Sequence, residues 1–161
     1  MKKSLVTGAM AGLCGGIGMK ALVCLFDRDS FGLSARTDAR FARAIWARMG
    51  CGELDEKSAQ RIGTLVHYAF ATATGVGYAL TAARLPVIRA GRGTLFGAGL
   101  WFLGDECAIS ASGLEEPGRA GLRSHVSALA AHLIYGVVLH SIASTVAVSP
   151  EPTGVDAQES L

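Results

Sequence analysis

Charge is scarce in this 161-residue chain, in which only 17% of the residues are Asp, Glu, Lys or Arg. Soluble globular domains carry about a quarter. Aromatic residues make up 7% of the chain, and the formal net charge is only +2. Half of the residues are nevertheless hydrophobic, which excludes an intrinsically disordered chain. We expect no nucleic acid among its partners.

Cysteines are few, and their spacing excludes the common cysteine sites. Cys14, Cys24, Cys51 and Cys107 form no CxxC pair and no zinc-binding pattern. The chain also lacks GxGxxG after a strand, lacks GxxxxGK[ST], and shows no identifiable pair of nucleophile and base. We therefore expect no catalytic residues, no metal site and no cofactor, and a role other than that of an enzyme.

Glycine, in contrast, is abundant, with 21 residues in the chain, nearly twice the usual share of about 7%. An apolar chain rich in glycine and poor in rings suits close helix packing in lipid. Four apolar stretches, at residues 5–26, 62–83, 93–111 and 126–148, approach the roughly 20 residues needed to cross a bilayer. They lack the alternation of barrel strands. The sequence predicts an all-α, four-helix transmembrane bundle.

One domain accounts for most of the chain. We expect residues 1–148 to form a single integral-membrane helical domain and residues 149–161, with two prolines and three acids, to form a disordered tail. Gly50–Gly52 should end a helix in the first loop, and Asp55 is suited to cap the next helix at its N-terminus.

The first loop contains an amphipathic segment at residues 38–50. Its apolar residues recur at helical spacing, and arginines lie on or beside the other face. Such a helix lies in the membrane interface, or it caps the bundle through protein contacts. The residues assigned to this interface helix are Arg40, Phe41, Arg43, Ile45, Trp46 and Arg48.

Ionisable side chains inside the four stretches share one depth. At about 1.5 Å per residue, and with alternating helix directions, all lie roughly 20 Å from the same membrane face. Buried charges require partners, so Lys20 should pair with Asp105 or Glu106. The predicted polar layer comprises Lys20, His67, Asp105, Glu106 and His132, and Tyr135 is placed to hydrogen-bond into it.

Three interpretations of this layer are open. It can be a structural cluster that fixes helix order and organises a scaffold or an oligomer. It can handle protons or a small cation, because imidazole beside carboxylate titrates near neutrality. It can also hold haem or a metal through His67 and His132.

Small residues at four-residue spacing predict close helix contacts. Packing within the chain is favoured, and contact in a homo-oligomer is also open. The glycines concerned are Gly8, Gly12, Gly16, Gly75, Gly93 and Gly97, with Ala71 completing the pattern in the second stretch.

Several motifs together resemble a known family. They are MKALV around Lys20, HYAFATATGVGYAL from His67, GRGTLFGAGLWFLGDE ending at Glu106, and HLIYGVVLH from His132. In this order the chain resembles the YagU family of small bacterial inner-membrane proteins over most of residues 5–143. The resemblance implies a multi-pass protein of the bacterial inner membrane, with the lipid bilayer as its partner, and supplies no catalytic assignment.

Overall fold

The computed structural model describes residues 2–26, 28–82, 84–109 and 122–147, and the predicted tail at 149–161 lies outside these ranges. Within them the secondary structure is entirely helical, with no strand. The elements are α1 (Lys2–Phe26), α2 (Arg28–Arg48), α3 (Glu56–Thr81), η1 (Pro86–Gly93), α4 (Thr94–Trp101), η2 (Phe102–Ile109) and α5 (Leu122–Ala147).

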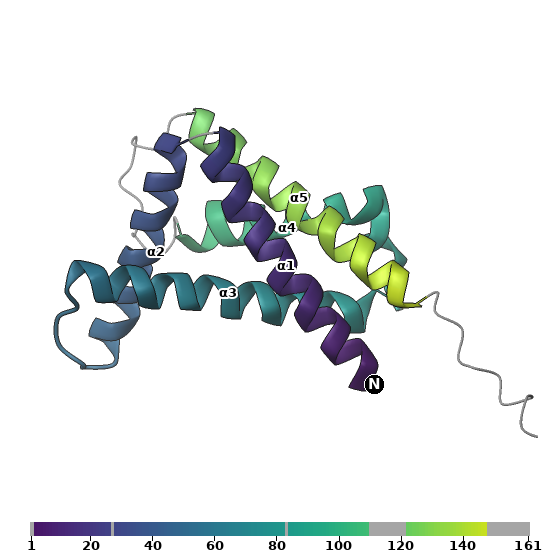
Figure 1. Ribbon diagram of the computed structural model, residues 1–161, viewed down its shortest axis with the longest axis horizontal. Helices are drawn as coiled ribbons and strands as arrows, with labels where there is room; N and C mark the ends of the chain where they lie inside the picture. The colour runs from purple at the N-terminus through teal and green to yellow at the C-terminus, as the bar shows by residue number, and fades with distance from the viewer. Residues whose placement is uncertain (1, 27, 83, 110–121, 148–161) are drawn as a thin grey trace, which may run out of the picture.

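The helices pack around α1 and α5. Figure 1 shows α1 and α5 side by side, with the start of α1 and the end of α5 at the same end of the molecule, so these helices are antiparallel. Helix α3 crosses α1, and the N-terminal part of α3 also contacts α2. Helix α4 packs against α5. This arrangement brings segments from all parts of the described chain to one central region.

Local signals in the sequence explain where α2 ends and α3 begins. Gly50 and Gly52 have φ values of +72° and +81°, which suit glycine because it has no Cβ. The side chain of Asp55 accepts a hydrogen bond of 3.1 Å from the backbone N–H of Ser58. The predicted break and the predicted N-cap are both confirmed.

The second helix is longer than predicted, because it begins at Arg28 rather than at residue 38. Residues 28–37 are too polar to show an apolar stripe, yet they contain no proline to stop a helix. A search for periodic apolar residues therefore detects only the second half of α2.

The predicted helix at 93–111 has two parts in the structure. Eight residues form α4, and the chain continues as a π-helix, η2, which carries Asp105 and Glu106. Turns of π-helix are rare in proteins, and those that occur are often found at functional sites. Before α4, the φ of Gly93 is +87°, and a Cβ there would lie 2.2 Å from the carbonyl oxygen of Gly136.

Two of the described helices contain segments long and apolar enough to cross a membrane, Lys3–Leu25 in α1 and His125–Thr145 in α5. Only 28% and 22% of these segments, respectively, is buried inside the structure, whereas the core helix of a soluble protein is buried along its apolar face. The apolar residues exposed on α1 include Val6, Met10, Leu13 and Ile17.

Candidate functional site

Close contact between helix backbones shapes the centre of the protein. A Cβ at Gly12 would lie 2.2 Å from the carbonyl oxygen of Ala71, and one at Gly75 would lie 2.4 Å from that of Gly8. The first and third helices therefore touch through their main chains. The same kind of contact joins α4 to α5 at Gly97, where a Cβ would lie 2.1 Å from the carbonyl oxygen of His132.

The remaining predicted glycines lie at the same crossings. Gly16 faces the Cβ of Ala71, and Gly93 faces Gly136. All six glycines thus face another helix of the same chain, and this close approach brings the side chains beside them together.

The first charged contact at this centre joins α1 to α2. The Nζ of Lys20 lies 2.5 Å from Oδ2 of Asp38, and the two side chains are 16% and 19% exposed. The sequence led us to expect Asp105 or Glu106 as a partner of Lys20. Asp38 is a partner that the sequence did not indicate, and α2 brings it to the level of the C-terminal half of α1.

Two histidines extend this contact across the bundle. The Nε2 of His67 lies 3.5 Å from the carbonyl oxygen of Gly16, and its ring interacts electrostatically with Lys20, Asp38 and His132. The Nδ1 of His132 lies 3.8 Å from Oδ2 of Asp105. We call this group the central cluster, and its members are Lys20, Asp38, His67, Asp105 and His132.

Glu106 and Tyr135, also predicted for the polar layer, have their described contacts elsewhere. Glu106 Oε1 lies 2.6 Å from Nδ1 of His125, near the beginning of α5. The buried Tyr135 hydroxyl donates to the carbonyl oxygen of Ala71 and lies 2.6 Å from Oγ1 of Thr74. Tyr135 thus ties α5 to α3.

Asp38 is the member of the central cluster that sequence reasoning missed. A signal for it was present, because Asp38 lies four residues before Ala42 and shares its helix face. Ala39 and Ala42 are each only 1% exposed, and a Cβ at Gly63 of α3 would lie 2.5 Å from the carbonyl carbon of Asp38. The face that carries Asp38 is therefore the one that packs on α3.

The amphipathic half of α2 contacts the rest of the protein on one face. Ala39 and Ala42 pack against the protein, while Phe41 and Met49 are 39% and 67% exposed. The indole of Trp46 donates to the carbonyl oxygen of Cys51. Ile45 is half-buried, and Arg40 and Arg48 are exposed. One face of α2 thus meets α3, and apolar and basic side chains remain on its outside.

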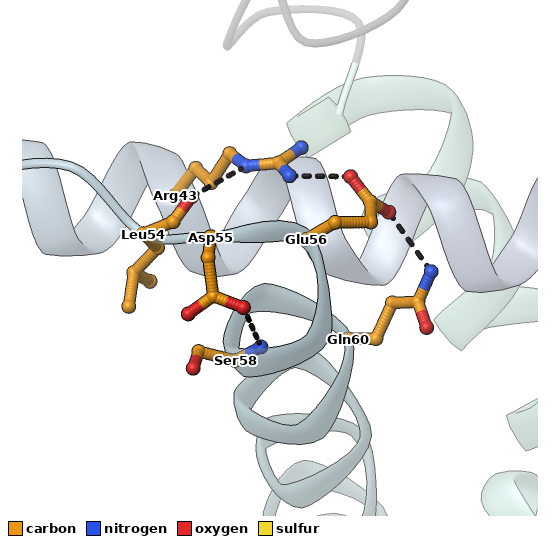
Figure 2. A network of polar contacts seen from close by, with 6 residues as sticks. All are labelled: Arg43, Leu54, Asp55, Glu56, Ser58 and Gln60. Carbon is orange, nitrogen blue, oxygen red and sulfur yellow. Dashed lines mark hydrogen bonds and ion pairs between the residues drawn. The ribbon is translucent and has the colours of Figure 1, made fainter.

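Arg43, which the sequence assigned to the interface helix, holds the corner between α2 and α3. Figure 2 shows its guanidinium reaching Glu56, with Nη2 2.5 Å from Oε2. Its Nε donates to the carbonyl oxygen of Leu54, and the amide of Gln60 donates to the other oxygen of Glu56. These contacts fix α2 against the start of α3.

The carboxylates of this corner make stability depend on pH. The hydrogen bond from the Arg43 guanidinium lowers the pKa of Glu56 below its ordinary value of 4.5, and the hydrogen bond from the Gln60 amide lowers it further. Hydrogen bonding by Ser58 holds the pKa of Asp55 below 3.8. A lowered folded-state pKa stabilises the fold above these ordinary values, and this stabilisation is lost as the pH falls through the lowered ones.

We therefore expect Arg43→Gln to make the acid-induced fall in melting temperature shallower, because Glu56 loses the partner that lowers its pKa. Melting temperature measured from pH 6 down to about pH 3 tests this. Arg48→Gln removes an equal charge from an exposed position on the same helix. The melting temperature of this control should depend on pH as that of the wild type does. Equal profiles for all three proteins would contradict the expectation.

Comparison with known proteins places the chain in a family. A family model described as "Protein of unknown function (DUF1440)" matches residues 52–141, which is more than half of the chain. The chain belongs to this family. The DUF1440 match contains His67, Asp105 and His132 of the central cluster, whereas Lys20 and Asp38 precede it. No curated protein and no solved structure matched the chain.

Proposed function

We propose that this DUF1440 protein is a multi-pass protein of the bacterial inner membrane. The apolar segments of α1 and α5 support this, as does the resemblance to the YagU family. The elements of the two other predicted spans also carry exposed apolar side chains, namely Leu65 and Phe70 on α3 and Leu95, Phe102 and Leu103 on α4 and η2. Lipid would cover these faces, which would otherwise form large apolar patches in water.

Within that membrane domain, we propose a non-enzymatic role in which the central cluster accepts and releases protons. The observation that carries this proposal is the position of His67, whose ring interacts with Lys20, Asp38 and His132 at once. Imidazole is the side chain whose ordinary pKa lies nearest to neutrality. A proton needs only one imidazole nitrogen, whereas a metal cation needs several ligands arranged around it.

Hydrogen bonds indicate which ring nitrogens would exchange the proton. The Nδ1 of His132 lies 2.9 Å from the carbonyl oxygen of Ala128. A carbonyl only accepts, so this nitrogen carries the hydrogen of the neutral ring and Nε2 is left to accept a proton. When Nε2 is protonated, the ring becomes an imidazolium. Asp105 stabilises this cation, since its Oδ2 lies 3.8 Å from Nδ1 of the same ring.

The second histidine has the opposite arrangement. The Nε2 of His67 faces the carbonyl oxygen of Gly16 and carries the hydrogen, so Nδ1 is the accepting nitrogen. Asp38, which is paired with Lys20, also interacts electrostatically with this ring. Each imidazole of the central cluster thus has one ring nitrogen that can accept a proton, Nε2 in His132 and Nδ1 in His67.

Flux of protons into proteoliposomes tests the proposal. We expect Lys20→Met and Asp105→Asn each to reduce flux at least about tenfold, which corresponds to about 1.4 kcal/mol in a rate barrier. Lys3→Met makes the same substitution at an exposed position of α1 and should conduct like the wild type. Cluster variants that insert normally and conduct normally would refute a role in proton transfer.

The same experiment separates the alternative of a scaffold. The exposed stripe of Val6, Met10, Leu13 and Ile17 on α1 has the spacing of a helix–helix contact face. A scaffold predicts no flux in the wild type and a smaller detergent complex for the cluster variants. Loss of flux with an unchanged complex size favours proton transfer.

A further inference from the structure

A shallow hollow on α3 carries positive charge that the central cluster does not use. It has a volume of about 370 Å³ and is lined by Lys57, Gln60, Arg61 and Thr64. All four side chains can donate hydrogen bonds. Among the described contacts, neither Lys57 nor Arg61 has an ion pair or a side-chain hydrogen bond. Two cations thus border one hollow without a described acid between them.

The two carboxylates at the start of α3 have partners of their own, one of which, Gln60, also lines the hollow. Asp55 accepts from the backbone N–H of Ser58, and Glu56 binds Arg43 and Gln60 (Figure 2). Both acids therefore have partners at the corner between α2 and α3. Lys57 also lies in the first turn of α3, where the helix dipole adds positive potential. The electrostatics favour an anion.

An apolar surface continues from the hollow along the same face of α3. Leu65 follows Arg61 by four residues and is 68% exposed. Ala69, four residues after Leu65, is also exposed and lies about 80° around the helix from Arg61. The face thus changes from cationic to apolar in one direction. This order of properties matches an amphiphile, with an anionic head and a hydrocarbon chain.

We propose that this face binds one anionic phospholipid, with the phosphate in the hollow between Lys57 and Arg61 and an acyl chain along Leu65. Only two cations border the hollow, and the apolar surface beside it offers nothing to a polyanion such as nucleic acid. Phe41 and Met49 of neighbouring α2 are exposed as well, as expected at a membrane interface. The inference rests on the proposed membrane location and does not depend on proton transfer.

Lipid binding to the purified full chain in neutral detergent tests the site. Native mass spectrometry should show retention of phosphatidylglycerol in preference to phosphatidylcholine. The double variant of Lys57→Gln with Arg61→Gln should bind phosphatidylglycerol at least about tenfold more weakly, because each cation near a membrane surface contributes about one factor of five. The matched control of Arg84→Gln with Arg89→Gln removes two exposed cations beyond the other end of α3 and should bind like the wild type.

Two further arms identify the source of the phosphate. Leu65→Ser should weaken phosphatidylglycerol binding while leaving the helical circular dichroism unchanged. Inorganic phosphate at millimolar concentration should not displace the lipid; displacement would indicate a soluble anion and overturn the lipid assignment. Equal losses of binding in the Lys57→Gln, Arg61→Gln variant and in the Arg84→Gln, Arg89→Gln control would show a general effect of charge. That result would also overturn the lipid assignment. Normal lipid binding in Lys20→Met, whatever its proton flux, keeps this outcome separate from the proposed function.

Discussion

Gly12→Ala is expected to separate α1 from α3 and to destabilise the protein by at least about 2 kcal/mol. Overpacking a closely packed contact costs about 1–3 kcal/mol even where side chains can adjust. Here the added methyl group would lie 2.2 Å from a backbone carbonyl oxygen, so a whole helix must move. Thermal unfolding in detergent, followed by circular dichroism, measures the effect.

Gly18 provides a control in the same helix. A Cβ there would meet nothing within 4 Å, and alanine is favoured over glycine in a helix by about 1 kcal/mol. Gly18→Ala should therefore leave stability unchanged or raise it. If both variants behave alike, the close contact of α1 with α3 is not what holds the bundle together.

Lys20→Met is the second change for which we expect a large effect. Removing one partner of a buried ion pair costs about 3–5 kcal/mol, because the other charge remains buried. Lys20 and Asp38 retain 16% and 19% exposure, so we expect a loss near the lower end of that range. Chemical unfolding in detergent provides the free energy of unfolding.

The double variant of Lys20→Met with Asp38→Asn distinguishes the ion pair from a general loss of packing. It should recover at least about 1 kcal/mol relative to the sum of the two single effects, as interacting neighbours do in double-mutant cycles. Strictly additive effects would show that Lys20 and Asp38 act independently. Lys3→Met, at an exposed position of the same helix, should have little effect.

The sequence was sufficient to predict three of the helices and to predict that several polar side chains lie near one another. Long apolar stretches located α1, α3 and α5, and counting residues from the ends of each predicted span placed Lys20, His67 and His132 at one depth. The structure brings these three side chains within electrostatic reach of one another. Depth follows from residue counts along single helices, which is why it can be predicted without tertiary information.

The partners of these groups were not predictable in the same way. Which carboxylate meets Lys20 depends on how α2 folds back onto α3, and the apolar stripe at residues 38–50 indicates the buried face of α2 without indicating what that face packs against. Asp105 and Glu106 are adjacent in sequence, yet one faces His132 and the other His125. A π-helix turns less per residue than an α-helix, so an α-helical projection of this segment assigns its faces incorrectly.

The packing of α2 links the outside of the protein to its centre. Asp38 on this helix pairs with Lys20, and Arg43 on the same helix is tied to Glu56, next to Lys57 of the proposed lipid site. A shift of α2 would change both places at once. Coupling of this kind is reciprocal by thermodynamic necessity: if lipid charge alters the proton affinity of the cluster, protonation must alter lipid affinity by the same factor.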